Sequence, residues 1–102
     1  DEEANLIMKH LSNKDYIISL TIEGSILSSP DLSEKIRETF INYSNITFII
    51  GGSNGIRQDI KDKSHYKLSF SRLTYPHGLF RLILLEQIYR SFKIINNETY
   101  HK

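Results

Sequence analysis

A cluster of glycines follows an apolar stretch in the middle of the sequence. The stretch Ile46–Ile50 runs directly into Gly51–Gly55, which reads GGSNG. Glycines at the carboxyl end of a buried strand let the backbone approach a flat ligand, and open parallel sheets bind ligands at this edge. No Lys-Ser or Lys-Thr pair follows, and the spacing differs from GxGxxG, so neither a phosphate loop nor a dinucleotide fingerprint is present. The pattern fits a ligand-binding turn and an ordinary tight turn about equally.

A second polar loop spans Ser71–Gly78 and has the sequence SRLTYPHG. It follows the next predicted strand, so both loops should open on the same edge of the sheet. His77 can serve there as a base or as a phosphate contact, although a single loop histidine is more often solvated or a helix cap. Arg81, about one helical turn further on, is better placed to meet an anion.

The last predicted helix carries a polar stripe that consists of Glu86, Gln87, Arg90 and Lys93. Glu86 and Arg90 are four residues apart, which favours an ion pair within the helix, and a structural pair is the default interpretation. The remaining flank is apolar and would be exposed in a monomer; it comprises Leu85, Ile88, Tyr89 and Phe92. Exposed apolar patches usually mark interfaces, so we expect the protein to dimerise through this helix.

The C-terminal residues Tyr100, His101 and Lys102 place an aromatic ring, a titratable group and a cation together. A chain end of this kind is ordinarily disordered. A metal site is not expected, because the histidines lack ligand spacing and the chain has no cysteine. These histidines are His10, His65, His77 and His101.

Charge is distributed unevenly along the chain. Positions 1–50 hold eight acidic and four basic residues, whereas positions 51–102 hold four acidic and nine basic residues. This asymmetry suggests that one end meets a polyanion, although an unevenly charged solvated surface explains it as well. The sequence shows no cysteine, no signal peptide and no apolar run of membrane-spanning length, so we expect a cytoplasmic protein.

The apolar pattern predicts strands that alternate with helices. Hydrophobic residues make up 39% and charged residues 25%, which is typical of one soluble globular domain over residues 1–102. Strands are expected at 16–22, 46–50 and 67–70. Glu23-Gly24-Ser25 should end the first strand, and this strand should be central in the sheet because both its faces are apolar. Helices are expected at 2–11, at 56–63 and, as the last helix, up to Ile95. Another helix should begin with a Ser29 cap and Pro30 and be closed by Asn45. Its buried stripe would consist of Leu32, Ile36, Phe40 and Tyr43. This order indicates an α/β fold with a parallel sheet.

The last helix is apolar on almost every side in its first half. Only Arg81 interrupts the series Leu79, Phe80, Leu82, Ile83, Leu84 and Leu85. So wide an apolar surface must be covered on several faces. The helix is therefore expected to pass through the middle of the domain, to bury a face against another subunit, or to do both.

Three segments in this order resemble the ribosomal RNA large-subunit methyltransferase H family. They are FIIGGSNG (Phe48–Gly55), LSFSRLTYPHGLFRLILLEQIYRSFKI (Leu68–Ile94) and the terminal YHK. The family belongs to the SPOUT class of knotted methyltransferases, and the chain looks like the last two-thirds of a member, without its N-terminal strand and helix. The resemblance implies an α/β parallel-sheet domain with helices on both faces and a C-terminal trefoil knot, in which the last segment threads through a preceding loop.

The resemblance also implies an activity and its residues. The enzyme would transfer a methyl group from S-adenosylmethionine to N3 of a pseudouridine in large-subunit (23S) ribosomal RNA, as a homodimer packed through the long helix. Family cofactor positions match Leu20, Gly51, Phe70, Ser71, Arg72, Leu73, Thr74 and Tyr75. Removal of the N3 proton needs a base; His101, contributed across the dimer, is the first candidate and His77 the second, unless water serves. Expected RNA contacts are Arg81, Arg90, Lys93 and Lys102 to phosphates and Tyr100 stacked on a base.

Three alternatives stay open from the sequence. The chain can be an RNA- or ribosome-binding module without chemistry, or an inactive fragment of the enzyme, since a missing strand and helix would expose a sheet edge. A knotted methyltransferase that acts on tRNA is the third, because the residues do not fix the nucleotide.

Overall fold

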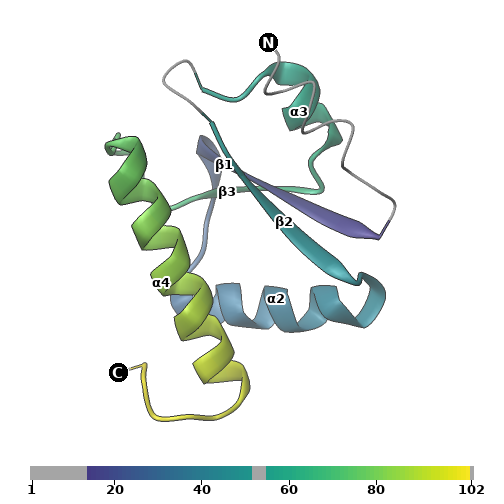
Figure 1. Ribbon diagram of the computed structural model, residues 1–102, viewed down its shortest axis with the longest axis vertical. Helices are drawn as coiled ribbons and strands as arrows, with labels where there is room; N and C mark the ends of the chain where they lie inside the picture. Colours follow the sequence, from purple (N-terminus) through teal and green to yellow (C-terminus); the bar gives the residue numbers. More distant parts are fainter. Residues whose placement is uncertain (1–13, 52–54, 102) are drawn as a thin grey trace.

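The computed structural model describes residues 14–51 and 55–101 and contains a three-stranded parallel sheet (Figure 1). The sheet order is β2-β1-β3, so the first strand is central, as predicted. The helix expected at residues 2–11 lies outside the described residues. The elements in chain order are β1 (Asp15–Ile26), α2 (Ser29–Asn42), β2 (Asn45–Ile50), α3 (Gln58–Lys63), β3 (Tyr66–Ser69) and α4 (His77–Ile95).

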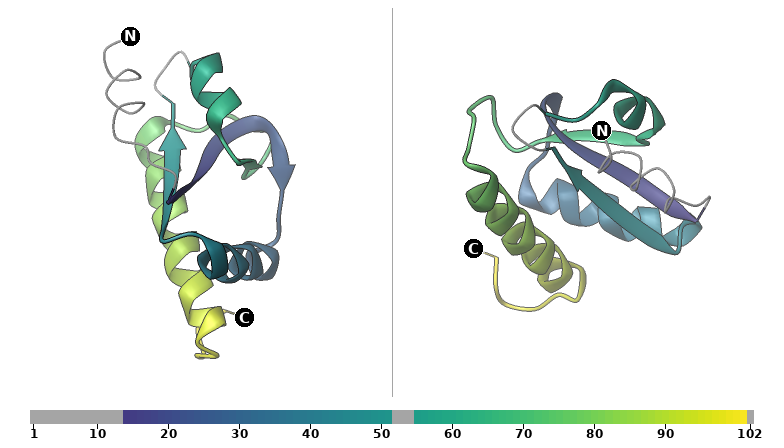
Figure 2. Two further views of the ribbon diagram at one scale, coloured as in Figure 1. Left: turned by 90° about the vertical axis from the view of Figure 1, so that its right-hand side faces the viewer. Right: turned by 45° about the horizontal axis from the view of Figure 1, so that its top comes forward.

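Helices cover both faces of the sheet, as expected, with α3 on one side and α2 and α4 on the other (Figures 1 and 2). Successive side chains of a strand point to opposite faces, so β1 contributes to two apolar cores. Ile17 packs with Ile49 and Ile60 under α3. The larger core, on the side of α2 and α4, consists of Ile18, Leu20, Leu32, Ile36, Leu68 and Leu84. The parallel α/β fold is thus confirmed, whereas the threading of the C-terminal segment stays a prediction.

The end of β1 differs from the prediction that Glu23-Gly24-Ser25 would stop the strand. β1 continues to Ile26, and its pairing with β3 shifts register between Leu20 and Ser25, so that both residues pair with Leu68. A Cβ atom on Gly24 would lie 2.7 Å from the backbone carbonyl carbon and oxygen of Lys67. Glycine is needed here because the two backbones approach closely, not because the strand ends.

The start of α2 lies at the predicted place but uses the neighbouring serine as its cap. Ser28 is the N-cap and its Oγ accepts a hydrogen bond from the Asp31 amide at 3.2 Å, while Ser29 is already helical. The helix ends at Asn42, and Asn45 begins β2 instead of closing the helix. Phe40, predicted to be buried, is 43% exposed.

The apolar surface of α4 is largely uncovered within one chain. Leu84 and Ser91 are buried at the contact with α2, but Leu79, Leu82, Leu85, Tyr89 and Phe92 are between 42% and 64% exposed. The helix therefore does not pass through the middle of the described part of the domain, and this alternative was wrong. None of the helices in residues 14–51 and 55–101 is long and apolar enough to span a bilayer.

Candidate functional site

A cavity of about 530 Å³ lies between the second half of β1, the end of β2 and the loop before α4. Its walls include five of the residues predicted to bind a cofactor: Leu20, Gly51, Leu73, Thr74 and Tyr75. The glycine turn and the proline loop therefore open onto one cavity, as expected from the position of both at the carboxyl edge of the sheet.

Eight further residues line this cavity and were not predicted: Thr21, Ile22, Glu23, Ile50, Gly55, Ile56, Lys61 and Phe80. Thr21 and Ile50 adjoin a predicted residue and Gly55 belongs to the GGSNG turn, so position in the chain was the signal that could have found these three. Lys61 is different, because it reaches the site from α3. Its Nζ lies 2.8 Å from Glu23 Oε1, and this hydrogen bond holds the pKa of the Glu23 carboxyl below its usual value.

Phe70, Ser71 and Arg72 support the cavity instead of lining it. Arg72 donates hydrogen bonds to the carbonyl oxygens of Ile22 and Gly24, the latter at 3.1 Å, and so ties the loop to the displaced end of β1. Since the loop is fixed to the strand beside the cavity, these residues can shape the site without contacting a ligand.

The loop before α4 is also braced by its own side chains. Ser71 Oγ accepts hydrogen bonds from the Leu73 amide at 2.8 Å and from the Tyr75 hydroxyl at 3.1 Å. The rings of Phe70 and Tyr75 both pack on Phe80, with centroid distances of 5.3 and 6.0 Å. Such bracing orders the loop before any ligand arrives, which lowers the entropic cost of binding.

The two ends of the glycine turn approach each other closely at Gly51, as the backbones of β1 and β3 do at Gly24. A Cβ atom on Gly51 would lie 2.6 Å from the carbonyl carbon of Gly55 and 2.8 Å from the amide nitrogen of Ile56. Gly55 itself has a φ of +82°, in the region that favours glycine. Another residue of the cavity wall, Thr21, has a buried Oγ1 with no hydrogen-bond partner among the described residues.

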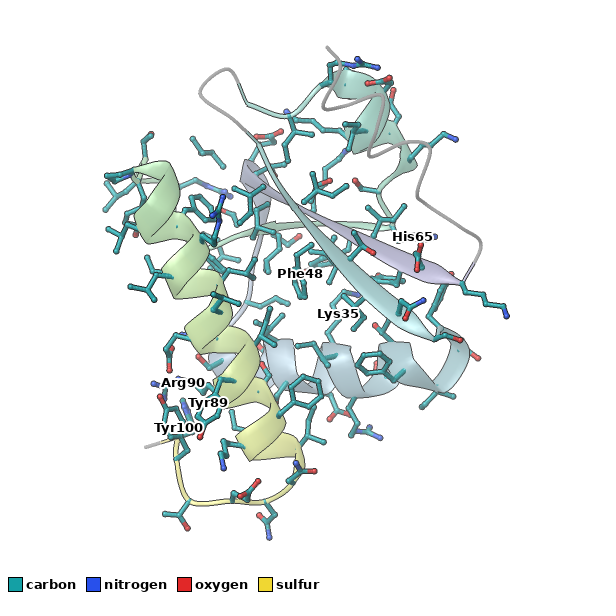
Figure 3. All side chains as sticks on the ribbon, in the orientation of Figure 1. Lys35, Phe48, His65, Tyr89, Arg90 and Tyr100 are labelled. Atoms are coloured by element: carbon teal, nitrogen blue, oxygen red, sulfur yellow. The ribbon has the colours of Figure 1, made fainter. Side chains whose placement is uncertain are left out.

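Three of the five predicted RNA-binding residues, Arg90, Lys93 and Tyr100, lie in a second cluster at the other end of α4 (Figure 3). Arg90 forms the predicted ion pair with Glu86, with Nη2 and Oε2 2.8 Å apart. The Tyr100 hydroxyl donates a hydrogen bond to Glu86 Oε2 at 3.1 Å, and Arg90 Nη1 donates one to His101 Nδ1 at 3.0 Å. Lys93 is 3.0 Å from Glu98. The chain end therefore folds back onto α4, whereas the default expectation was a disordered tail.

Electrostatics within this second cluster follow from these contacts. Hydrogen bonds from Arg90, and then from Tyr100, hold the pKa of Glu86 below its ordinary value. The same bond to Glu86 raises the pKa of the Tyr100 hydroxyl. The Arg90 guanidinium also lies over the Tyr100 ring, 5.0 Å from its centroid, and Tyr100 meets Tyr89 edge to face. Charge, hydrogen bonding and ring packing thus all fix the same tail residues.

The two clusters are far apart within one chain. Arg90 is thirteen positions after His77, the first residue of α4, which corresponds to about 20 Å along the axis. Arg81 is exposed near the cavity end of the helix. The side chain of His77 and all of Lys102 lie outside the described residues. The structure does not bring His101 to the cavity of its own chain.

Comparison with known proteins supplies a family. The model of the family described as predicted SPOUT methyltransferase matches residues 1–101. A ribosomal RNA large subunit methyltransferase H of Finegoldia magna is 52% identical, one of Ureaplasma urealyticum 46% and one of Clostridium botulinum 44%. Each match covers 100% of this chain and 65% of the relative, so the chain spans about two-thirds of the length of these proteins.

Proposed function

We propose that this chain, which belongs to the family of predicted SPOUT methyltransferases, acts as an S-adenosylmethionine-dependent methyltransferase on large-subunit ribosomal RNA. The observation that carries the proposal is the shared cavity of the glycine turn and the proline loop. Leu20, Gly51, Leu73, Thr74 and Tyr75 come from three separate segments and line that one cavity. The match of these positions to the cofactor positions of the family supports the same conclusion.

The residues around the cavity fit an adenosyl group. Its apolar walls, among them Leu20, Ile50 and Phe80, suit a flat aromatic base. The close backbone around Gly51 leaves peptide groups to face a ligand, and the buried Thr21 hydroxyl lacks a partner. When bound, S-adenosylmethionine supplies an activated methyl group. The protein's part is to hold it beside the acceptor nitrogen, since positioning accounts for much of such catalysis.

The relatives are named for ribosomal RNA, and we propose N3 of a pseudouridine in 23S rRNA as the acceptor. The N3 proton must pass to a base within hydrogen-bond reach. His101 is the first candidate and His77 the second. His101 Nδ1 accepts a hydrogen bond from Arg90, so its use as a base requires that bond to open. Because His101 is about 20 Å along α4 from its own cavity, it would serve the cavity of a partner subunit.

A homodimer packed through α4 meets this requirement. The exposed leucines and aromatic residues of α4 form an apolar stripe along the helix, and a stripe of this kind favours association. We place the dimer in the cytoplasm, where ribosomal RNA is available. In such a dimer each RNA site would combine one chain's cavity with the tail of the other.

RNA would be held by Arg81, Arg90, Lys93 and Lys102 through phosphates, with Tyr100 stacked on an exposed base. Two of these cations are already paired, Arg90 with Glu86 and Lys93 with Glu98. An arginine has five N–H donors and a lysine three, so both can contact a phosphate without leaving these carboxylates. Because phosphate contacts release counterions, we expect RNA binding to weaken steeply as salt concentration rises.

Calorimetry and methyl transfer test the proposal together. The protein should bind S-adenosylmethionine, and Gly51→Ala should weaken binding because its Cβ would push Gly55 and Ile56 away. Gly78→Ala is the matched control, since nothing lies within 4 Å of the Cβ position there. Labelled methyl should enter the RNA of assembled ribosomes or free rRNA. If it enters only tRNA, the substrate is tRNA and not rRNA. If the protein does not bind the cofactor, the proposal is rejected.

A second candidate is an RNA-binding module without chemistry, which the basic second half of the chain favours. It predicts salt-dependent RNA binding that is indifferent to S-adenosylmethionine, and no incorporation of methyl. Cofactor binding without methyl transfer would instead identify the chain as an inactive part of the enzyme. Comparison with a longer chain of the length of its relatives separates these two outcomes.

A further inference from the structure

Glu86 is the point at which the folded-back tail is fixed to α4. Its carboxylate accepts hydrogen bonds from three side chains, those of Arg90, Tyr100 and Gln87, at distances from 3.0 to 3.4 Å. Arg90 in turn donates to His101. Among the described residues, Glu86 thus contacts Tyr100 directly and His101 through one intermediate.

The same carboxylate is connected to the body of the domain. Gln87 donates to Glu86 Oε1 through its Nε2 at 3.0 Å and accepts a hydrogen bond from the Ser29 hydroxyl through its Oε1 at 2.7 Å. Ser29 is in the first turn of α2, which packs on the sheet. The network therefore runs without a break from α2 across α4 to the tail.

We infer that Glu86 is a positioning residue, which holds Tyr100 in place for the RNA base that accepts the methyl group. This inference rests on the proposed function. In this role Glu86 acts through the Tyr100 ring, which would stack on the base, and not on cofactor or RNA itself. A carboxylate suits this task, because one group can accept several hydrogen bonds at once and bonds to a charged acceptor are stronger than neutral ones.

An ordinary helix ion pair gives a useful contrast. Glu34 and Arg37 form such a pair on α2, and no tail residue up to His101 forms a hydrogen bond or an ion pair with it. Exposed pairs of this type contribute little to stability. If Glu86 only formed an ion pair of the same kind, its replacement would have as little effect as the replacement of Glu34, and the position of the tail would not change.

The test compares Glu86→Ala, Glu86→Gln, Tyr100→Phe and the double variant E86A/Y100F with Glu34→Ala as the matched control. Tyr100→Phe keeps the ring that would stack on RNA but removes the hydroxyl that contacts Glu86. We expect Glu86→Ala to lower kcat/KM for methyl transfer about tenfold, the effect of losing one hydrogen bond to a charged group. Glu86→Gln keeps an acceptor and should recover part of the activity.

Three further results are expected. Addition of Tyr100→Phe to Glu86→Ala lowers kcat/KM no further, because both changes remove the same contact. Glu34→Ala leaves transfer within about twofold of the wild type, and all variants bind S-adenosylmethionine with unchanged affinity. The inference would be overturned if the loss of kcat/KM in the double variant equalled the product of the two single losses. Methyl transfer at the wild-type rate by Glu86→Ala would overturn it as well.

A structural readout separates failure of this inference from failure of the proposed function. NMR of the Tyr100 ring should show a fixed ring in the wild type and in Glu34→Ala, and a released one in Glu86→Ala. If the wild type neither binds the cofactor nor transfers methyl, the enzymatic proposal fails. If methyl is transferred but the Tyr100 resonances do not change in Glu86→Ala, the role assigned to Glu86 fails alone.

Discussion

Gly24 occupies a position in β1 where no larger residue fits. Its missing Cβ would lie 2.7 Å from the backbone of Lys67 in β3, and backbone atoms cannot turn aside as a side chain can. We expect Gly24→Ala to lower the free energy of unfolding by about 1–3 kcal/mol, the usual cost of overpacking. Urea denaturation measures this loss.

Gly78→Ala is the matched reference for this experiment. Gly78 lies in the first turn of α4, with open space around its Cβ position, so alanine there should raise stability by about 0.5–1 kcal/mol. A Gly24→Ala variant as stable as the wild type would show that β1 and β3 can separate at this point without cost.

Protonation of Glu86 should release Tyr100. The folded state holds the pKa of Glu86 below its ordinary value of 4.5, so the unfolded or undocked state binds its proton more readily. The contribution of this carboxylate to tail docking is therefore complete above the ordinary pKa and is lost as pH falls through the lowered one. NMR of the Tyr100 ring during acidification should show a transition with its midpoint below 4.5; a midpoint at or above that value would contradict the prediction.

Single residues of the candidate cavity were only partly predictable from the sequence. Leu20, Gly51 and Leu73–Tyr75 were found because they follow buried strands or match the family positions. Glu23 and Lys61 were missed, since their approach depends on the register shift of β1, which no local pattern encodes. Ser71 and Arg72 were placed in the right loop and Phe70 at the end of the preceding strand, but their packing and hydrogen bonds make all three supports of the loop.

The two adjacent serines before α2 illustrate what limits prediction for a whole element. The helix was expected from Pro30 and the apolar spacing, yet the sequence could not decide which serine is the cap. Ser28 has the extended backbone of a cap, with ψ at 165°, and its hydroxyl meets the Asp31 amide. Boundaries of this kind depend on a single backbone angle, whereas the existence of the helix depends on many residues.

Loss of this cap should weaken α2 measurably. Ser28→Ala removes the acceptor for the Asp31 amide, and the expected cost is about 1 kcal/mol. Ser28→Asp provides a carboxylate acceptor at the same place and should keep the wild-type stability. Thermal or urea unfolding of the two variants distinguishes the cap from a general effect of replacing serine; equal losses in both would assign the cap elsewhere.

At the scale of the whole molecule, α4 joins two regions that a single chain keeps apart. The cavity is at the N-terminal end of the helix, and the tail residues are about 20 Å further along it. The apolar pattern of α4 left three explanations: burial inside the domain, burial against a second subunit, or both. The exposed leucines argue against burial inside the described part of the domain. The proposed partner subunit would cover them and would also bring its tail to the cavity.

The dimer can be tested with one substitution in the middle of the exposed stripe. Leu82 is 64% exposed in one chain, so Leu82→Glu should alter the stability of the monomer by no more than about 0.5 kcal/mol. In a dimer packed through α4 it would bury a carboxylate without a partner, at a cost of several kcal/mol. Sedimentation should therefore show a dimer for the wild type at micromolar concentration and a monomer for Leu82→Glu. Because the cavity lies within one chain, the variant should still bind S-adenosylmethionine but lose methyl transfer.

Ile41→Glu is the control, since Ile41 is 70% exposed on α2 and not on the stripe; it should remain dimeric and active. A monomeric wild type, or a Leu82→Glu variant that still sediments as a dimer, would contradict both the dimer and the shared RNA site built on it.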